Sequence, residues 1–184
     1  IMALETINNN MSVSSEITNI DLIEPTSFHS LSDKWTLWVH LPHDTDWNMK
    51  SYKTIHSFQN MEEAISVCEV IPEKMIQNCM MFLMRDGITP LWEDKQNRNG
   101  GCFSYKVANN IVAELWRKLF YNIVGETTTN NNEIIINGFT ISPKKNFCII
   151  KIWTGNCKVQ NPKIFNIDGF SDVACLFKTH QVQY

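Results

Sequence analysis

The sequence predicts an α+β fold in which a mainly antiparallel sheet carries helices on one of its faces. Short segments of alternating apolar and polar residues recur along the chain, separated by clusters of Gly, Pro, Asn and Asp. One longer segment, 109–125, keeps its apolar residues on a single helical stripe. Such a helix packs on one face of a sheet, so the opposite face is left open. With 184 residues, 43% of them hydrophobic and 19% charged, the chain is long enough for one domain with a sizeable core.

The expected elements follow a flexible N-terminal tail, residues 1–28, and fall within one domain, 29–184. The tail is rich in Asn, Ser, Thr and acidic residues, which cannot supply a core. In chain order the elements are strand 34–41, strand 51–58, helix 60–71, strand 79–87, strand 102–107, helix 109–125, strand 133–142, strand 147–154 and strand 172–179.

The first half of the chain supplies strands around a short helix. The stretch "KWTLWVHL" alternates so that Trp35 and Leu37 share one face and Trp38 lies on the other. Asn60, followed by two acids, is typical of a helix N-terminus. The apolar stretch "CMMFLMRDG" is expected to be a buried strand that turns at Gly87.

The second half contains the longest helix and a hairpin. In helix 109–125, Leu115 and Leu119 are four residues apart with Trp116 beside them, and Gly125 is the expected stop. "EIIINGFTIS", "PKKN" and "FCIIKIWT" indicate a strand, a turn and a strand. Because Trp35, Trp38 and Trp116 follow strand or helix periodicity, we expect them to pack in the core.

Charge and cysteine content exclude several classes of protein. A net charge of −3 and a pI near 5.9 argue against a sequence-blind nucleic-acid binder, although a reader of one nucleotide needs only a few local cations. The six cysteines form no CxxC pair and no zinc spacing, which indicates reduced thiols and neither a metal site nor a cofactor. No apolar run reaches membrane-spanning length, so we expect a cytoplasmic protein, with the nucleus as an alternative.

Two tryptophans stand in polar loops, where a core residue is not expected. Trp47 lies in "PHDTDWNMK", and Trp92 lies in "PLWEDKQNRNGG" with Glu93 next to it. Facing indole rings would form a slot for a planar ring, and a cationic ring would gain further from their faces. Glu93 could accept two N–H groups from a guanine edge, so 7-methylguanine matches these parts best. Lys144 and Lys145, in a hairpin turn, could meet its phosphates.

The motifs "HSLSDKWTLWVH", "DTDWNMK", "DGITPLWEDKQNRNGG", "IVGE" and "IKIWT" resemble, in order and spacing, translation initiation factor 4E, the mRNA cap-binding family. The resemblance implies a curved antiparallel sheet with helices on its convex face and the cap on its concave face. It assigns stacking to Trp47 and Trp92 and recognition of the guanine edge to Glu93. It also places Trp153 near the methyl group, Lys144 at a phosphate, and His180 at the outer end of the cap.

The phosphate contacts depart from the family pattern. The second phosphate-binding lysine of the family falls on Ile149, and its arginine after the Gly pair falls on Cys102. The resemblance therefore implies a grip that depends on Lys144, assisted by Lys145, Arg98 or Lys151.

The convex face departs further. In the family a tryptophan on the first helix anchors a partner peptide of the Tyr-x4-Leu-apolar type. We expect weak binding of that peptide and a divergent scaffold or regulatory protein on this face. The positions implied for partner binding are His29, Ser30, Met61, Ile65 (in place of the tryptophan), Arg117, Lys118 and Tyr121.

Three functional classes compete. The first is a cap-binding module without catalysis that acts in translation initiation. It would either deliver capped mRNA to a scaffold protein, or act as a repressor or a partner-switched variant that does not engage the standard scaffold factor. The second is an enzyme acting on nucleotides, against which stands the lack of a paired-acid, Gly-rich phosphate or Cys–His motif. The third is an interaction domain that has lost the cap, against which stand Trp47, Trp92, Glu93 and Trp153. The first class is the prediction.

Overall fold

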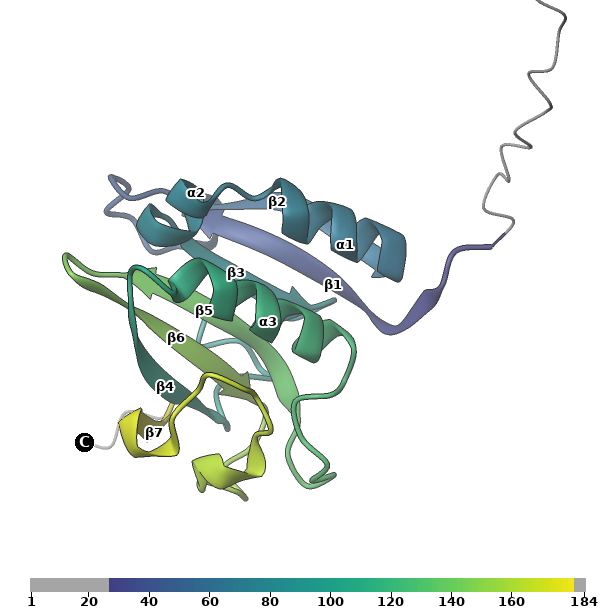
Figure 1. The fold of residues 1–184 in the computed structure, drawn as a ribbon, viewed down its shortest axis with the longest axis vertical. Coiled ribbons are helices and arrows are strands. Elements are labelled where there is room, and N and C mark those ends of the chain that lie inside the picture. The colour runs from purple at the N-terminus through teal and green to yellow at the C-terminus, as the bar shows by residue number, and fades with distance from the viewer. Residues whose placement is uncertain (1–26, 181–184) are drawn as a thin grey trace, which may run out of the picture.

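The computed structural model describes residues 27–180, and all but the last two residues of the expected tail, 1–28, lie outside them. The described part is one seven-stranded antiparallel sheet with strand order β2-β1-β3-β5-β6-β4-β7 and three α-helices on one of its faces (Figure 1). The predicted α+β fold is confirmed. The elements are β1 (Ser30–His40), β2 (Tyr52–Asn60), α1 (Met61–Val70), α2 (Glu73–Asn78), β3 (Met80–Arg85), β4 (Gly101–Ala108), α3 (Val112–Val124), β5 (Ile136–Pro143), β6 (Phe147–Thr154) and β7 (Cys175–Thr179).

Three details differ from the prediction. The short helix α2 was not expected, because six residues between Pro72 and a new strand are too few to show a helical period. β1 begins at Ser30 rather than 34, since the buried Leu31 and the pairing of Ser30 with Asn60 extend it. Residues 172–174 form a 3-10 turn instead of the start of β7.

Alternation along β1 assigns the two faces of the sheet as predicted. Trp35 and Leu37 are buried in the main core beneath the helices, where Trp116 of α3 is also buried. Trp38 packs instead against a smaller apolar cluster on the other face, which contains Phe82 and Trp153. The helices therefore cover one side, and side chains of the smaller cluster form the floor of the other.

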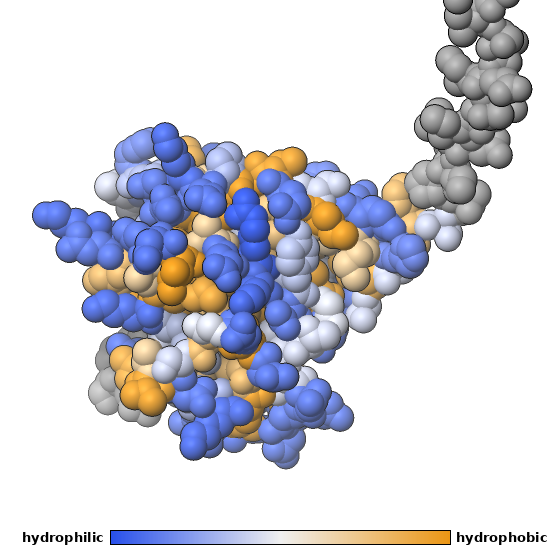
Figure 2. All heavy atoms as spheres, viewed as in Figure 1, coloured by the Kyte–Doolittle hydropathy of each residue, from blue (hydrophilic) through white to orange (hydrophobic). Residues whose placement is uncertain are grey.

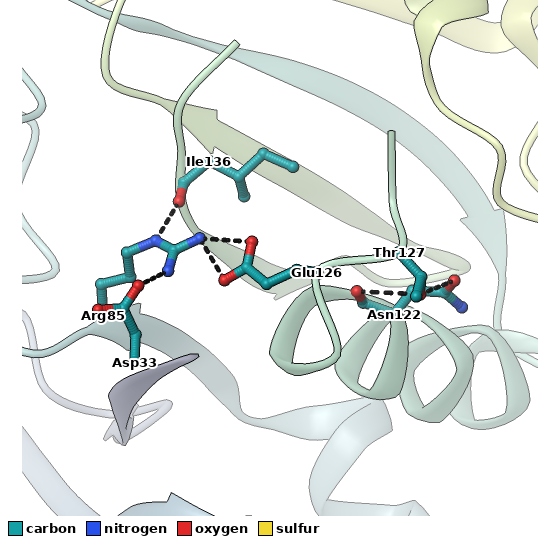
Figure 3. Close-up of polar contacts among 6 residues, drawn as sticks. All are labelled: Asp33, Arg85, Asn122, Glu126, Thr127 and Ile136. Carbon is teal, nitrogen blue, oxygen red and sulfur yellow. Dashed lines mark hydrogen bonds and ion pairs between the residues drawn. The ribbon is translucent and has the colours of Figure 1, made fainter. Parts of the chain in front are cut away.

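The turn after α3 is held by an ion-pair cluster around Arg85, and the positive φ of this turn is not at the glycine. Gly125 follows the helix with φ −86°, and Glu126 is the residue with positive φ, at 55°. Arg85 donates to Glu126 (2.9 Å) and to the carbonyl of Ile136 (2.8 Å), and it also pairs with Asp33 (Figure 3). These contacts offset the cost of about 1–2 kcal/mol for a left-handed non-glycine residue. They join β1, β3, β5 and the turn after α3.

No helix in the described range 27–180 is both long and apolar enough to cross a membrane.

Candidate functional site

A cavity of about 540 Å3 opens on the face of the sheet opposite the helices. Its floor comes from Phe82 and Trp153, whose sequence neighbours Leu83 and Ile152 point into the helix-side core. The lining residues are Trp47, Tyr52, Met80, Phe82, Pro90, Leu91, Trp92, Glu93, Cys102, Lys151, Trp153, Lys178, Thr179 and His180. The structure thus brings together five of the seven residues implied for cap binding, namely Trp47, Trp92, Glu93, Trp153 and His180.

Both loop tryptophans leave ring surface available to a ligand. Trp47 is 56% exposed and Trp92 is 46% exposed, unusually high fractions for the largest apolar side chain. One face of Trp47 is occupied by His40, whose ring is parallel to the indole at 4.2 Å. His40 is itself fixed, because it is buried and its Nε2 is 2.8 Å from the carbonyl of Asp46. The arrangement can stack a flat ring for roughly 1–3 kcal/mol.

Glu93 presents a carboxylate at the cavity without an internal hydrogen-bond donor. Among residues 27–180 no hydrogen bond or ion pair engages it, and its side chain is exposed. Tyr52 lines the same cavity. Its pKa is raised mainly by burial and further by the negative charge of Glu93. A free carboxylate beside aromatic faces can accept two N–H groups of a planar ligand.

The loop that carries Trp92 and Glu93 is fixed by Asp94. Its carboxylate accepts hydrogen bonds from the backbone N–H and hydroxyl of Thr89, at 2.9 and 2.6 Å, and from the N–H of Gln96. Burial acts to raise the pKa of Asp94, but these hydrogen bonds outweigh it and hold the pKa below its usual value. The adjacent acids therefore have different roles: one faces the cavity and the other shapes the loop.

The fully buried Asn97 connects this loop to the rest of the sheet. Its amide donates to the carbonyls of Thr89 (3.1 Å) and Leu91 (2.8 Å), and its Oδ1 accepts from Asn137 of β5 (2.9 Å). Its backbone carbonyl accepts from His180 Nδ1 (2.8 Å). One residue thus positions the Trp92 loop through its side chain and His180, next to the end of β7, through its backbone carbonyl.

The Gly pair that closes the loop is required by close approach of the backbone. A side chain at Gly100 would collide with the carbonyl oxygen of Thr154, and one at Gly101 would lie against the carbonyl oxygen of Lys178 and the ring of Phe177. Only residues without a Cβ let the loop join β6 and β7 at this point.

His180 lines the cavity beside the floor residue Trp153. Trp153 is 7% exposed, its Nε1 has no partner within the described chain, and its ring lies 4.7 Å from that of His180. Burial lowers the pKa of His180 and the nearby Lys151 charge adds to this, whereas the hydrogen bond to Asn97 opposes it. Burial thus favours the neutral form of the His180 ring beside Trp153.

A second cavity of about 410 Å3 adjoins the first and contains Lys144. Trp47, Met80 and Lys151 line both cavities. Lys145, the neighbouring lysine of the turn, lines neither. The two lysines of the expected phosphate site are thus separated by the fold, and only Lys144 lies beside the slot.

On the helix face the residues implied for partner binding remain on one surface, but their charges are already paired. Figure 2 shows this face as mostly hydrophilic with apolar patches. Tyr121 donates to Glu69 (2.6 Å) and Lys118 to Asp168 (2.8 Å). Arg117 donates to the carbonyl of Ile71 at 2.9 Å. The positive charges of Arg117 and Lys118, which lie at positions implied for partner binding, are therefore held within the molecule.

The apolar residues among those implied for partner binding lie on α1. Ile65 is 45% exposed and Met61 is also exposed. His29, just before Ser30, pairs with Glu62 at 2.7 Å and fixes the start of β1 against this helix. A surface of this kind can receive an apolar side chain of a partner.

Sequence reasoning missed His40, Tyr52 and Asn97. His40 alternates with the core residues Leu37 and Val39 on β1, so a stricter reading of strand faces would have placed it on the open side. Tyr52 has the same parity as the core residue Phe58, and an irregularity in the pairing of β2 with β1 puts it on the open side, so alternation alone would have misplaced it. The contacts of Asn97 reach residues far along the chain and leave no local signal.

The comparisons with known proteins agree with this architecture. Residues 30–184 match the family model described as eukaryotic initiation factor 4E. Eukaryotic translation initiation factor 4E-2 of Schizosaccharomyces pombe is 33% identical over 138 residues, covering 70% of this chain and 55% of that protein. The Candida glabrata factor 4E is 30% identical over 136 residues, covering 70% and 64%. The chain thus matches less than two thirds of the length of these curated relatives.

Solved structures share the fold. Ascaris suum eIF4E-3 with m7G cap has a TM-score of 0.69 at 19% identity, covering 85% of this chain and 94% of that one. C. elegans eIF4E-3 with the 4E-binding protein Mextli and a cap analog has a TM-score of 0.65 at 23% identity, covering 74% and 80%. With the family model matched along more than half of its length, the chain belongs to the eukaryotic initiation factor 4E family.

Proposed function

We propose that the protein binds the 7-methylguanosine 5′ cap of mRNA and acts in translation initiation together with a partner protein. The observation that carries this proposal is that Trp47, Trp92, Glu93 and Trp153 line one and the same cavity. Two exposed indoles fit a flat cationic ring, and a carboxylate without an internal donor fits the N–H groups of the guanine edge. Relatives solved with m7G cap and with 4E-binding proteins support the same ligand and the same type of partner.

We further propose binding without catalysis, in the cytoplasm. The groups that line the slot serve to stack and to accept hydrogen bonds, which is sufficient for recognition. The check is chemical: 7-methyl-GTP incubated with the protein, with and without magnesium, should be recovered intact. Conversion of the ligand at a rate that depends on Glu93 would replace this proposal with an enzymatic one.

The test of binding is a titration with 7-methyl-GTP and, separately, with GTP, followed by tryptophan fluorescence. Strong quenching by the methylated ligand with much weaker quenching by GTP is expected, because only the methylated ring is cationic. Equal or absent binding of the two would overturn the proposal.

A second candidate is a repressor or partner-switched variant that binds the cap but does not engage the standard scaffold factor. Ile65, in place of the tryptophan expected from the resemblance, favours it, as do the internally paired charges of Arg117 and Lys118. Calorimetry with a Tyr-x4-Leu-apolar peptide separates the two: tight binding supports the promoting role, and weak binding supports the variant.

A further inference from the structure

The two cavities on the open face meet at Lys151. Of the residues they share, Trp47 and Met80 are apolar, and Lys151 is the one that carries a charge. A ligand whose ring fills the slot beside Trp47 and whose chain continues toward Lys144 must pass this ammonium group. Lys151 therefore lies where the two cavities join, whereas Lys144 lines the second cavity alone.

The neighbours of Lys151 in the sheet supply no charge. It is paired with Thr140 on β5 and with Ser104 on β4, and its side chain is half-buried. Two residues earlier on the same face of β6 is Ile149, where the resemblance would place a phosphate-binding lysine. The positively charged residue of β6 is therefore two positions nearer to Trp153, and so nearer to the slot, than the resemblance implies.

Lys151 also lacks an internal partner. Across residues 27–180 no carboxylate forms an ion pair with it, in contrast to Lys118, which has both Glu114 and Asp168. A half-buried cation without a counter-charge is costly in the free protein, and an anion that reaches it gains from reduced solvent screening. The one acid lining the second cavity is Asp44, whose Oδ1 already accepts from the N–H of Asp46 at 3.0 Å.

We propose that Lys151 is the principal phosphate contact of this chain and that Lys144 is a secondary one. The inference rests on the proposed cap-binding function and deepens it: the ligand recognised is a 7-methylguanosine polyphosphate, and the first phosphates after the nucleoside are gripped from β6. Lys145 and Arg98, which line neither cavity, do not contribute.

The test compares 7-methylguanosine with 7-methyl-GTP in the full chain. The Lys151→Gln variant should lose roughly ten-fold or more in affinity for 7-methyl-GTP, as expected for a lost charge-assisted contact, and little for the nucleoside. Lys145→Gln, which removes the same charge outside both cavities, is the matched control. It should retain the wild-type ratio of the affinity for 7-methyl-GTP to the affinity for 7-methylguanosine. Asp44→Asn should favour the triphosphate further by removing a like charge from the path.

The inference is overturned if Lys151→Gln leaves this ratio of affinities unchanged, or if Lys145→Gln loses as much affinity for 7-methyl-GTP as Lys151→Gln does. Either result leaves cap binding intact. Failure of the wild-type protein to bind either methylated ligand overturns the proposed function itself. A second readout needs no ligand: the His180 ring should titrate at higher pH by NMR in Lys151→Gln, because the nearby charge lowers its pKa. No change there would show that the ammonium lies elsewhere.

Discussion

The rings of His40 and Trp47 lie parallel, with an interplanar angle of 5° and centroids 4.2 Å apart. His40 belongs to β1 and is buried, whereas Trp47 lies in the loop before β2 and is exposed. The imidazole also contacts the edge of Tyr52, at 5.1 Å. A loop tryptophan is therefore backed by a rigid element of the sheet, which reduces the conformational entropy that a ligand must remove on stacking.

His40→Ala should weaken 7-methyl-GTP binding by about 2–10-fold, the equivalent of one aromatic pair worth about 0.5–1.5 kcal/mol. The reason is loss of the support behind Trp47 rather than loss of a ligand contact. Fluorescence titration measures it, and His40→Phe should restore most of the affinity. Wild-type affinity in the alanine variant would show that the stack is not needed.

Glu93→Gln should reduce affinity for 7-methyl-GTP by about ten-fold or more, since a charged acceptor is replaced by an amide that cannot accept both N–H groups. Calorimetry of the folded variant gives the loss. Glu73→Gln on α2 removes the same charge from the helix side and should bind like the wild type. Equal binding by both variants would remove Glu93 from the site.

Asn97→Ala should lower the free energy of unfolding by more than about 2 kcal/mol, because it removes three buried side-chain hydrogen bonds: those donated to the carbonyls of Thr89 and Leu91, and the one accepted from the amide of Asn137. Thermal unfolding measures the effect. Asn146→Ala, in the exposed turn between β5 and β6, is the control and should change stability little. Cap affinity of Asn97→Ala should also fall, since the loop that carries Trp92 is released.

The sequence predicts the open face and its aromatic residues but not how the loops are held. Alternation in β1 is local, so it assigns Trp35 and Trp38 to opposite faces without knowledge of the fold. The bond between Asn97 and Asn137 spans 40 residues, and no periodicity encodes it. The choice of Lys151 over Arg98 likewise depends on where β6 lies relative to two cavities, which spacing alone does not give.

Stability should fall in two steps as the pH decreases. The fold lowers the pKa of His180, mainly through burial, so its contribution is complete above the unfolded value near 6.5 and is lost as the pH falls below it. The fold also lowers the pKa of Asp94, so a second contribution is lost below about 3.8. Thermal unfolding against pH should show the first step in the wild type and not in His180→Gln. The same step in both proteins would contradict the assignment.

Ile65→Trp should increase affinity for a short Tyr-x4-Leu-apolar peptide by roughly ten-fold or more, because buried tryptophans supply much of the energy at such interfaces. Ile65 is exposed on α1, so the larger ring can be placed without disturbing the core. Val70→Trp adds the same ring at a more exposed position of the same helix and is the matched control. If Ile65→Trp binds no better than the wild type, the paired charges of Arg117 and Lys118 rather than the missing ring weaken the surface. The Lys118→Leu variant should then improve binding, since it removes the cation held by Asp168 and places an apolar side chain on α3.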